Sequence, residues 1–575
     1  MRPLRILILS NTRPSRAWRL ALRVVNEISG AEIAGIVQRP LRELPFVQQE
    51  IIAGTALSEK IKSLFVRVSE GRLHRVRDGL LRAALWWIHG CPPEIPHRHP
   101  FTVSTLEGKC ASMGWPCLQA SSFDQQSVCD FIRRNGPALM IQLGPPGPVT
   151  PPAILPAFGL IRVRKGTLEH GAAIPQSATQ LLVEYIARDA RFAANLASVT
   201  LPSQFNDGPV GFTLKADLLG CDLILEALAS AVNRGGIPAA EDVSQWTRLI
   251  LSPYLEQLPP HARDGWGREP RAYCRPLWRL VLETMLLCSP LIVCRNWIRR
   301  LRRRYPVLIV AHHLVSDRRH RLGISTEKFW RQVRFLQDHY HIVGLSEAVA
   351  LMNSGSVASP TVSLTFDDGY ADNFVSLRAV ADEAEIPVSL FITTEPVSRH
   401  TEFQHDVLNG ELGALPLTWD QIRYWCTRGA EFGSHTRTHL DCGSADPNRL
   451  QDEILGARKE LERRLQRSVP YFAFPFGKLE NMSDKAVDLA RSGYRCFFSF
   501  WGGENVPRSG RMNSHLFRKI AYTEPWELEL ELQSIFDFTG VVRRALARVA
   551  GLFRQAEQGS AAMDGCNAQG STSLR

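Results

Sequence analysis

The sequence has no pair of cysteines with the Cys-x-x-Cys spacing, although twelve cysteines are scattered over its 575 residues. Widely spaced thiols favour a reducing compartment over a disulfide framework. A secretory signal is also lacking, because the apolar run at residues 4–9 is too short for the hydrophobic core of one. We therefore expect a cytoplasmic protein, and one whose substrate is made inside the cell.

No apolar run reaches the roughly 20 uninterrupted residues of a transmembrane helix. The best candidate, residues 277–294, contains Arg279, Glu283 and Pro290. A basic cluster then surrounds Trp297, and its members are Arg295, Arg299, Arg300, Arg302, Arg303 and Arg304. These residues are typical of a helix lying peripherally on an anionic inner membrane face. A helix packed between domains, with a solvated basic turn, explains them as well.

Nucleic-acid-binding modules are absent too, so the net charge of +11 does not indicate a nucleic-acid partner. The hydrophobic share of 45% and the charged share of 22% are those of a soluble globular protein. A chain of this length exceeds a single hydrophobic core, so we expect two or three domains.

Two adjacent carboxylates are the most informative feature of the second half. Val362, Leu364 and Phe366 alternate with polar residues, which predicts a strand packed on one side and ending at Asp367 and Asp368. Two like charges at a strand end repel each other unless a cation or a shared proton offsets the repulsion. An ordinary Asp-Gly turn is the alternative interpretation.

Two later stretches could meet these carboxylates. His435 and His439 are four residues apart, so one helical turn would direct both imidazoles to the same point. The apolar run 471–477 predicts another strand that ends in a Pro/Gly turn. One carboxylate with two imidazoles suits an open catalytic site for a divalent metal, and the other carboxylate could act as a general base. As a lone pair, the histidines could equally be solvated or core residues.

Together, Thr365-Phe-Asp-Asp-Gly369, His435-Thr-Arg-Thr-His439 and Phe474-Pro-Phe-Gly477 resemble the first three motifs of the polysaccharide deacetylase family (NodB homology domain). The resemblance runs from about residue 306 to about residue 522. It implies that Asp367 is the catalytic base and that Asp368, His435 and His439 bind a divalent metal, usually Zn²⁺. It also implies a substrate groove formed by Tyr370, Phe474, Pro475, Phe476 and Gly477.

Two departures from the family pattern stand out. Ala473 precedes the third motif, where an arginine that orients the base often stands. No Leu-x-His near the C-terminus supplies the general acid. His515 is a candidate for the acid, although a surface histidine explains it too, and Arg518 could take the orienting role.

The first half alternates strands and helices, which predicts a mostly parallel α/β sheet. It resembles the formyltransferase fold of methionyl-tRNA formyltransferase in its opening strand and helix and in the stretches 137–155, 159–166 and 205–210. Active members carry an asparagine, a histidine and an aspartate where this sequence has Arg162, Arg164 and Asn206, with Asp207 as a one-residue slip of the aspartate. The resemblance therefore implies an inactive domain, whose two arginines either grip an anion or form an exposed strand face.

The predicted fold class is thus α/β, with a Rossmann-like formyltransferase-type domain ahead of a distorted (β/α) barrel of NodB type. The predicted regions are 1–240 for the first domain, 241–305 for a linker with the apolar and basic helix, 306–540 for the barrel, and 541–575 for a basic helix and disordered tail. The predicted function is metal-dependent removal of an N-acyl group, most often acetyl, from an aminosugar of a glycan or glycan precursor. The alternatives are a deformylase of a formamido sugar on a lipid-linked precursor and a catalytically dead sugar-binding or scaffold protein.

Overall fold

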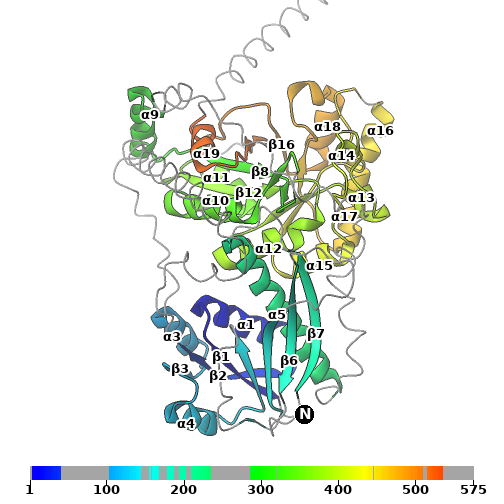
Figure 1. Ribbon diagram of the computed structural model, residues 1–575. Coiled ribbons are helices and arrows are strands. Elements are labelled where there is room, and N and C mark those ends of the chain that lie inside the picture. Colours follow the sequence, from blue (N-terminus) through cyan, green and yellow to red (C-terminus); the bar gives the residue numbers. More distant parts are fainter. Residues whose placement is uncertain are drawn as a thin grey trace, which may run out of the picture.

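The computed structural model describes residues 3–39, 103–143, 155–166 except 157, 178–186, 193–202, 209–234, 285, 287–508 except 319 and 445, and 514–534. The predicted regions 241–284 and 541–575 lie outside this part of the chain, as do Asn206 and Asp207. The described residues form two bodies, a sheet domain and a barrel, joined along one long helix (Figure 1).

The first body is a seven-stranded sheet in the order β3-β2-β1-β4-β5-β6-β7. Strands β1 to β5 pair in parallel, whereas β5, β6 and β7 pair antiparallel, so the sheet is mostly parallel, as predicted, with an antiparallel extension at one edge. Its elements are β1 (Leu4–Ser10), α1 (Pro14–Glu27), β2 (Ala31–Gln38), α3 (Val103–Ser112), β3 (Cys117–Gln119), α4 (Gln126–Asn135), β4 (Leu139–Leu143), β5 (Leu160–Gly166), β6 (Ala178–Ile186), β7 (Ala193–Pro202) and α5 (Pro209–Arg234).

Arg162, predicted either to grip an anion or to lie on an exposed strand face, is paired within the sheet. Strand β5 lies between β4 and β6, so it is not an edge strand. Arg162 Nε donates to Glu184 Oε2 at 2.6 Å across the β5–β6 pair, and both side chains are largely buried. The positive charge of Arg162 is therefore already matched within the sheet. The side chain of Arg164 lies outside the part of the chain that the structure describes.

The second body is a nearly closed parallel sheet surrounded by helices, as in a (β/α) barrel. The strand order is β17-β16-β15-β14-β13-β12-β8-β18, with β11 beside β12. Because β17 pairs with β16 and β18 pairs with β8, the two consecutive strands close the ring. The strands of this sheet are β8 (Val307–His312), β11 (His341–Ile342), β12 (Thr361–Phe366), β13 (Ser389–Ile392), β14 (Glu431–Ser434), β15 (Tyr471–Ala473), β16 (Cys496–Ser499), β17 (His515–Phe517) and β18 (Lys519–Ile520). A separate two-stranded sheet consists of β9 (Leu314–Val315) and β10 (Gly323–Ile324).

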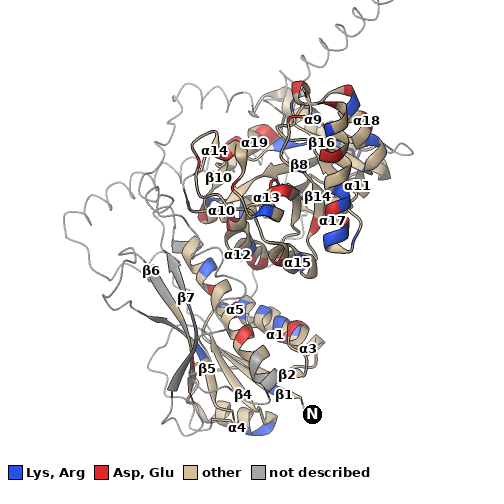
Figure 2. Ribbon diagram, turned by 90° about the vertical axis from the view of Figure 1, so that its right-hand side faces the viewer, with Lys and Arg blue, Asp and Glu red and all other residues tan. Residues whose placement is uncertain are grey.

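Helices cover the outside of this barrel. They are α9 (Pro290–Leu301), α10 (Thr326–His339), α11 (Leu345–Ser354), α12 (Ser376–Ala384), α13 (Thr394–Arg399), α14 (Gln404–Val407), α15 (Trp419–Thr427), α16 (Pro447–Gln451), α17 (Ala457–Leu465), α18 (Asp484–Gly493) and α19 (Pro525–Leu532). Local sequence fixes several of their starts: Ser325 caps α10, and Thr418 forms a capping box with Gln421 at α15. In Figure 2, charged residues of both signs lie on the helices, whereas the barrel strands are nearly free of them.

All six residues of β12 are buried, so the expectation that one side of this strand faces solvent is wrong. A parallel strand inside a barrel has side chains in the barrel interior on one face and helices on the other. Ser363 and Thr365 are fully buried for this reason, and Thr365 Oγ1 donates to the carbonyl of Val310 at 3.3 Å.

Helix α5 belongs to the packing of both bodies. Its early residues Leu214 and Leu218 belong to the hydrophobic core that α10 and α12 form on the outside of the barrel. Its later residues Leu223 and Leu228 pack in the core of the sheet domain. Buried ion pairs add to this contact: Lys215 Nζ lies 2.5 Å from Asp317 Oδ2, and Asp222 is held between Arg23 and Arg378. The two bodies therefore contact each other through α5, by apolar packing and by buried ion pairs.

Candidate metal and acid–base site

The carboxyl ends of the barrel strands meet at one end of the barrel, and this end carries the polar residues predicted from the sequence. Asp367 and Asp368 follow β12, His435 follows β14, and Arg518 lies between β17 and β18. The Asp367 amide donates to the carbonyl of His312 at 2.9 Å, so the acid pair lies directly beside the end of β8. Active sites of (β/α) barrels form at this end because loops from several strands converge there.

Asp368, His435 and His439 form the cluster with metal-ligand character. One potential ligand atom from each residue lies within 4.8 Å of those of the other two. His435 Nε2 is 3.5 Å and His439 Nε2 is 3.3 Å from Asp368 Oδ1. These separations suit three groups directed at one ion rather than at one another. The three residues predicted as ligands are therefore brought together.

The protonation of the histidines also fits metal binding. His435 Nδ1 lies 2.8 Å from the carbonyl of Ala473, and because a carbonyl only accepts, Nδ1 carries the proton and leaves Nε2 free. Burial lowers the pKa of His435 to about 4, so its ring is neutral at pH 7. Burial also lowers the pKa of His439 well below its usual value. Neutral imidazoles are the form that binds metals.

Asp368 is a buried carboxylate that lacks a compensating hydrogen bond. Neither of its two oxygens has a hydrogen-bond partner in the part of the chain that the structure describes. Burial, together with repulsion from Asp367 and Asp406, raises the pKa of Asp368 well above its usual range. A divalent cation between Asp368 and the two imidazoles would remove this penalty, so the residues present fit a metal ion.

Asp367 lies in a different electrostatic environment from its neighbour. Arg518 Nη1 donates to Asp367 Oδ1 at 2.6 Å, and both side chains are buried. Burial by itself raises the pKa of Asp367, but the charges of Arg518, His435 and His313 outweigh it and lower that pKa below its usual value. The Oδ2 atom of Asp367 has no partner among the described residues, so it is available as a proton acceptor.

The loop between His435 and His439 is not the helical turn expected from the four-residue spacing. Thr436 and His439 have positive φ angles of 64° and 63°, so the chain bends back twice between the two rings. Glu453 holds this loop: its Oε2 accepts from the backbone amides of Arg437 and Thr438 at 3.0 and 2.8 Å, and its Oε1 accepts from Thr438 Oγ1 at 2.7 Å. A spacing that suggested a helix is thus satisfied by a loop with a buried carboxylate inside it.

The predicted groove residues separate into two groups. Tyr370 and Phe474 are fully buried, and Pro475 and Gly477 are also buried, so none of these four forms an exposed groove wall. Phe474 packs on Phe472 and Phe497 in the core. Phe476 is 45% exposed and lies 4.9 Å from the ring of His439, so it is the residue of this motif that borders the site.

The imidazole of His515 packs against residues of β16. Its Nε2 lies 2.7 Å from Ser499 Oγ, and its ring stacks on Phe497. Arg518, three residues later, is the group from this stretch that reaches Asp367. The closure of the barrel at β17 and β18 places Arg518 there.

Sequence reasoning missed a second layer of polar residues around the site. His405 Nε2 lies 3.1 Å from the Tyr370 hydroxyl and 3.8 Å from Asp368 Oδ2, and its ring lies 4.1 Å from that of His439. Asp406 accepts from the Tyr370 hydroxyl at 2.6 Å. Burial lowers the pKa of His313 to about 4, and its other influences include Asp367 and Arg518. The only signal for His313 was its place after the apolar run that begins near residue 306, and nothing marked His405 and Asp406.

Comparisons with known proteins agree with this geometry. Residues 354–496 match the family model described as "Polysaccharide deacetylase". "Putative polysaccharide deacetylase YxkH" from Bacillus subtilis (strain 168) is 22% identical over 189 residues, which are 32% of this chain and 62% of YxkH. The chain thus spans less than two thirds of the length of this relative.

Two solved structures are similar to part of the chain. The Streptococcus pyogenes deacetylase PplD in complex with acetate is 21% identical, with a TM-score of 0.32, and the match covers 40% of this chain and 98% of PplD. IcaB from Ammonifex degensii is also 21% identical, with a TM-score of 0.34, and the match covers 40% of this chain and 97% of IcaB. The family match thus makes residues 354–496 similar to polysaccharide deacetylases.

Proposed function

We propose that the barrel is a metal-dependent carbohydrate N-deacetylase that hydrolyses the N-acetyl amide of an aminosugar in a glycan or glycan precursor. The convergence of Asp368, His435 and His439 beside a separately held Asp367 is the observation that supports this proposal most directly. Many proteins contain a cluster of metal-binding side chains. Hydrolysis by an activated water also requires a base, and a second buried acid with one free oxygen can supply it.

Asp368, His435 and His439 would hold the divalent ion, for which we propose Zn²⁺. When bound, such an ion supplies Lewis acidity toward an amide carbonyl and lowers the pKa of a neighbouring water. The remaining chemistry belongs to the chain. Arg518 fixes Asp367 Oδ1 and keeps the carboxylate ionised, while the free Oδ2 accepts the proton of the attacking water.

The departing amine needs a proton, and the acid that supplies it is unassigned. His515 is directed to Ser499 instead of the acid pair. Two imidazoles of the second layer lie near the acid pair: His405 Nε2 is 3.8 Å from Asp368 Oδ2, and His313 follows His312, whose carbonyl accepts from the Asp367 amide. Phe476 is exposed beside His439, where an apolar ring could stack on a sugar.

The identity of the acyl group can be tested with matched N-acetyl and N-formyl aminosugar oligomers. The purified chain and Zn²⁺ are incubated with each oligomer, and the released acetate and formate are measured. We expect acetate release that disappears in Asp367→Ala while bound metal remains. Faster release of formate would replace our proposal with the deformylase alternative. Absence of both products, with metal bound in the stoichiometry of one ion per chain, would favour a non-catalytic sugar-binding domain.

A further inference from the structure

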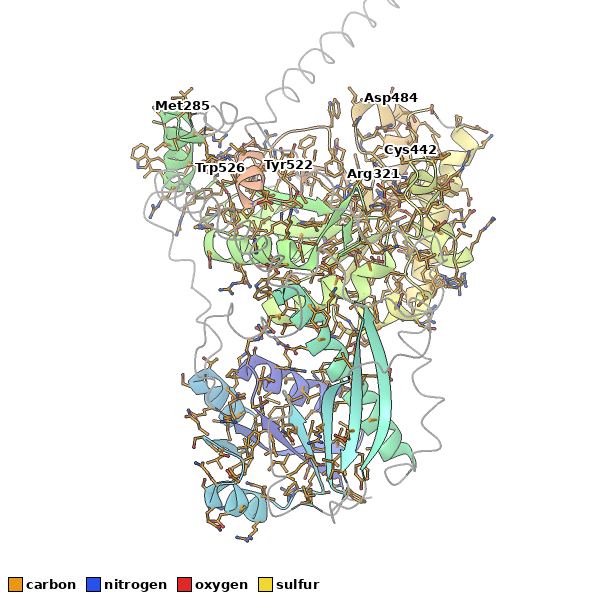
Figure 3. The ribbon with its side chains drawn as sticks, in the orientation of Figure 1. Met285, Arg321, Cys442, Asp484, Tyr522 and Trp526 are labelled. Atoms are coloured by element: carbon orange, nitrogen blue, oxygen red, sulfur yellow. The ribbon has the colours of Figure 1, made fainter. Side chains whose placement is uncertain are left out.

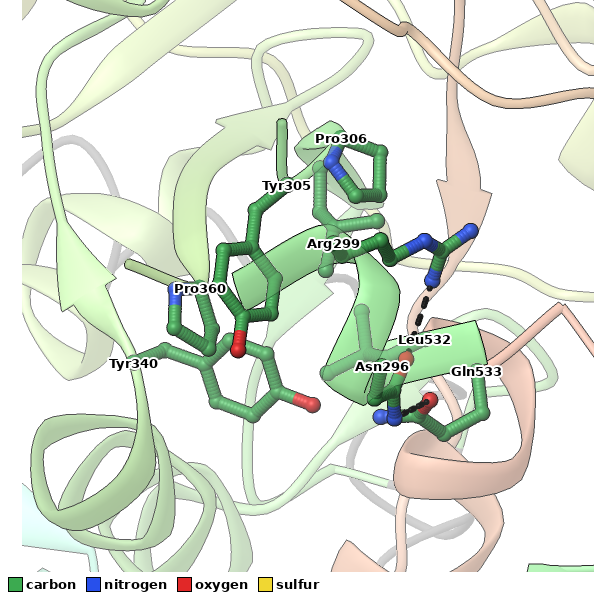
Figure 4. A pocket seen from close by; sticks show the side chains of 9 residues that line it. Asn296, Arg299, Tyr305, Pro306, Tyr340, Pro360, Leu532 and Gln533 are labelled. Atoms are coloured by element: carbon green, nitrogen blue, oxygen red, sulfur yellow. Dashed lines mark hydrogen bonds between the residues drawn. The ribbon is translucent and has the colours of Figure 1, made fainter. Parts of the chain in front are cut away.

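Helix α9 is attached to the barrel by its polar residues. Asn296 is 3% exposed, and its Nδ2 donates to Gln533 Oε1 at 3.0 Å (Figure 4). Arg295 Nη2 donates to the carbonyl of Gln533 at 2.9 Å, and Arg299 pairs with Glu504. This arrangement reverses the usual amphipathic helix, which packs its apolar side on the protein.

The apolar side of α9 consequently faces solvent. Leu291, Ile298 and Leu301 recur at the spacing of one helix face and are 82%, 43% and 63% exposed, and Trp297 beside them is 62% exposed. Met285, 68% exposed, lies at the outer edge of the molecule next to this helix (Figure 3). Five of the fourteen large hydrophobic side chains exposed in the described part of the chain are these residues, so they form a patch rather than the usual scatter.

Basic residues border the same patch. Arg300, Arg302, Arg303 and Arg304 are exposed, and they form no ion pair with the residues that the structure describes. Residues 290–305 contain no aspartate or glutamate. An apolar ridge, one exposed tryptophan and four unneutralised arginines thus lie on one short segment.

We propose that the α9 surface, defined as Met285, Leu291, Trp297, Ile298, Leu301 and the arginines 300 and 302–304, docks on the headgroup layer of an anionic phospholipid bilayer. The apolar residues would enter the boundary between headgroups and acyl chains, and the arginines would pair with lipid phosphates. No helix in the described part of the chain is long and apolar enough to cross a bilayer, so this contact is peripheral.

The charge of the α9 surface favours a lipid bilayer over a second copy of the chain as its binding partner. A two-fold dimer through α9 would place the four arginines of one copy near those of the other, which is repulsive. A nucleic acid would neutralise the arginines but would leave Leu291 and Leu301 without an apolar partner. An anionic bilayer satisfies both kinds of residue at once.

The position of α9 also determines how the domain would face the membrane. The chain runs from α9 through Tyr305 into the first residue of β8, whereas the acid pair lies beside the last residue of β8. Six strand residues, or roughly 20 Å, therefore separate the docking end of the barrel from its catalytic end. A docked domain would keep its catalytic end open to substrates arriving from the aqueous side.

The test is cosedimentation of the full chain with vesicles of phosphatidylcholine alone or with 30% phosphatidylglycerol. We expect binding to the anionic vesicles that weakens as salt is raised from about 0.05 to about 0.5 M. Arg302→Gln with Arg303→Gln should lower the partition by roughly twenty-five-fold, since each arginine near the surface contributes about fivefold. Trp297→Ser with Leu301→Ser should lower it by about tenfold or more.

Matched control variants lie on other surfaces. Arg463→Gln removes an exposed charge from α17, on the other side of the barrel in Figure 1, and Met113→Ser removes an exposed apolar side chain from the sheet domain. Both should bind as the parent does, and equal thermal melting confirms that each variant is folded. Equal partition of the parent and the α9 variants overturns the proposal, as does binding that ignores lipid charge. A concentration-dependent dimer that Trp297→Ser abolishes, with no vesicle binding, assigns the surface to a second copy instead. None of these outcomes depends on deacetylase activity.

Discussion

Replacing Arg518 with methionine removes the one positive charge that is seen to pair with Asp367 in the described part of the chain, while keeping a side chain of similar length. The pair is buried on both sides, with Nη1 and Oδ1 2.6 Å apart, and the guanidinium also lies over the ring of Phe500 at 4.5 Å. Removing one partner of a buried ion pair leaves the other charge uncompensated, which typically costs about 3–5 kcal/mol. Arg518→Met should therefore lower both stability and activity.

The pH dependence separates an electrostatic role of Arg518 from a merely structural one. In the parent, Arg518 lowers the pKa of Asp367 against the opposing effect of burial. Without the arginine, burial dominates and the pKa of Asp367 rises. One pKa unit corresponds to about 1.4 kcal/mol, so loss of even half of the pair's energy would move the acid limb of kcat/KM upward by about one pH unit.

The pH dependence of folding stability should change together with the pKa of Asp367. A carboxylate whose native pKa lies below its unfolded value stabilises the fold above the unfolded pKa, and this contribution is lost as the pH falls through the native pKa. The Asp367 contribution is therefore present at neutral pH in the parent. In Arg518→Met the native pKa lies above the unfolded value, so this residue disfavours folding at neutral pH and the deficit shrinks on acidification.

The assay is a pH series of acetate release together with thermal unfolding, for the parent, Arg518→Met, Arg518→Lys and the exposed control Arg463→Met. Lysine should restore part of the acid-limb position because it returns the charge without the planar guanidinium. An acid limb that stays at the parent pH while activity falls uniformly would refute the proposed role of Arg518.

Three further predictions follow from the same contacts. Chelation of divalent ions should abolish acetate release and lower the melting temperature, because Asp368 is then left buried without a partner. His435→Ala should also lose acetate release, and elemental analysis should show reduced bound metal. Asp367→Ala should keep its bound metal in the same elemental analysis. Glu453→Ala should weaken metal affinity by about 10–100-fold by releasing the loop between His435 and His439, and unchanged affinity in a metal titration would contradict this. Asp222→Asn should destabilise the fold by about 3 kcal/mol, measured by denaturant unfolding, because Arg23 and Arg378 both pair with this buried carboxylate; the exposed control Asp420→Asn should lie within about 0.5 kcal/mol of the parent.

Local sequence was enough to predict some of the strands and the residues at their ends. The runs at 307–312, 361–366 and 471–473 are short and apolar and end in polar or turn residues, so their strand character and the position of Asp367 could be inferred. The same reasoning failed where tertiary contacts override spacing. The loop of His435 and His439 appeared helical because four-residue spacing is shared by helices and by chains that bend back, and only the buried Glu453 decides between them.

The second layer around the site could not be predicted for a related reason. His405 and Asp406 lie on a short helix far along the chain from Asp368, and their proximity depends on how that segment folds over the barrel end. The interface between the barrel and the sheet domain could not be predicted from the sequence either. The apolar residues of α5 do not reveal that Leu214 and Leu218 face a different core from Leu223 and Leu228.

The sequence by itself indicated which residues could do chemistry here: two adjacent carboxylates, two histidines at a fixed spacing, and an arginine close to His515. It could do so because residue type and local periodicity are properties of short segments. The tertiary structure decided which of these residues meet, since closing the barrel at β17 and β18 brings Arg518 onto Asp367 across 151 positions of sequence. It also turned the apolar face of α9 outward, because that orientation depends on Gln533 and Glu504, which lie more than two hundred residues away.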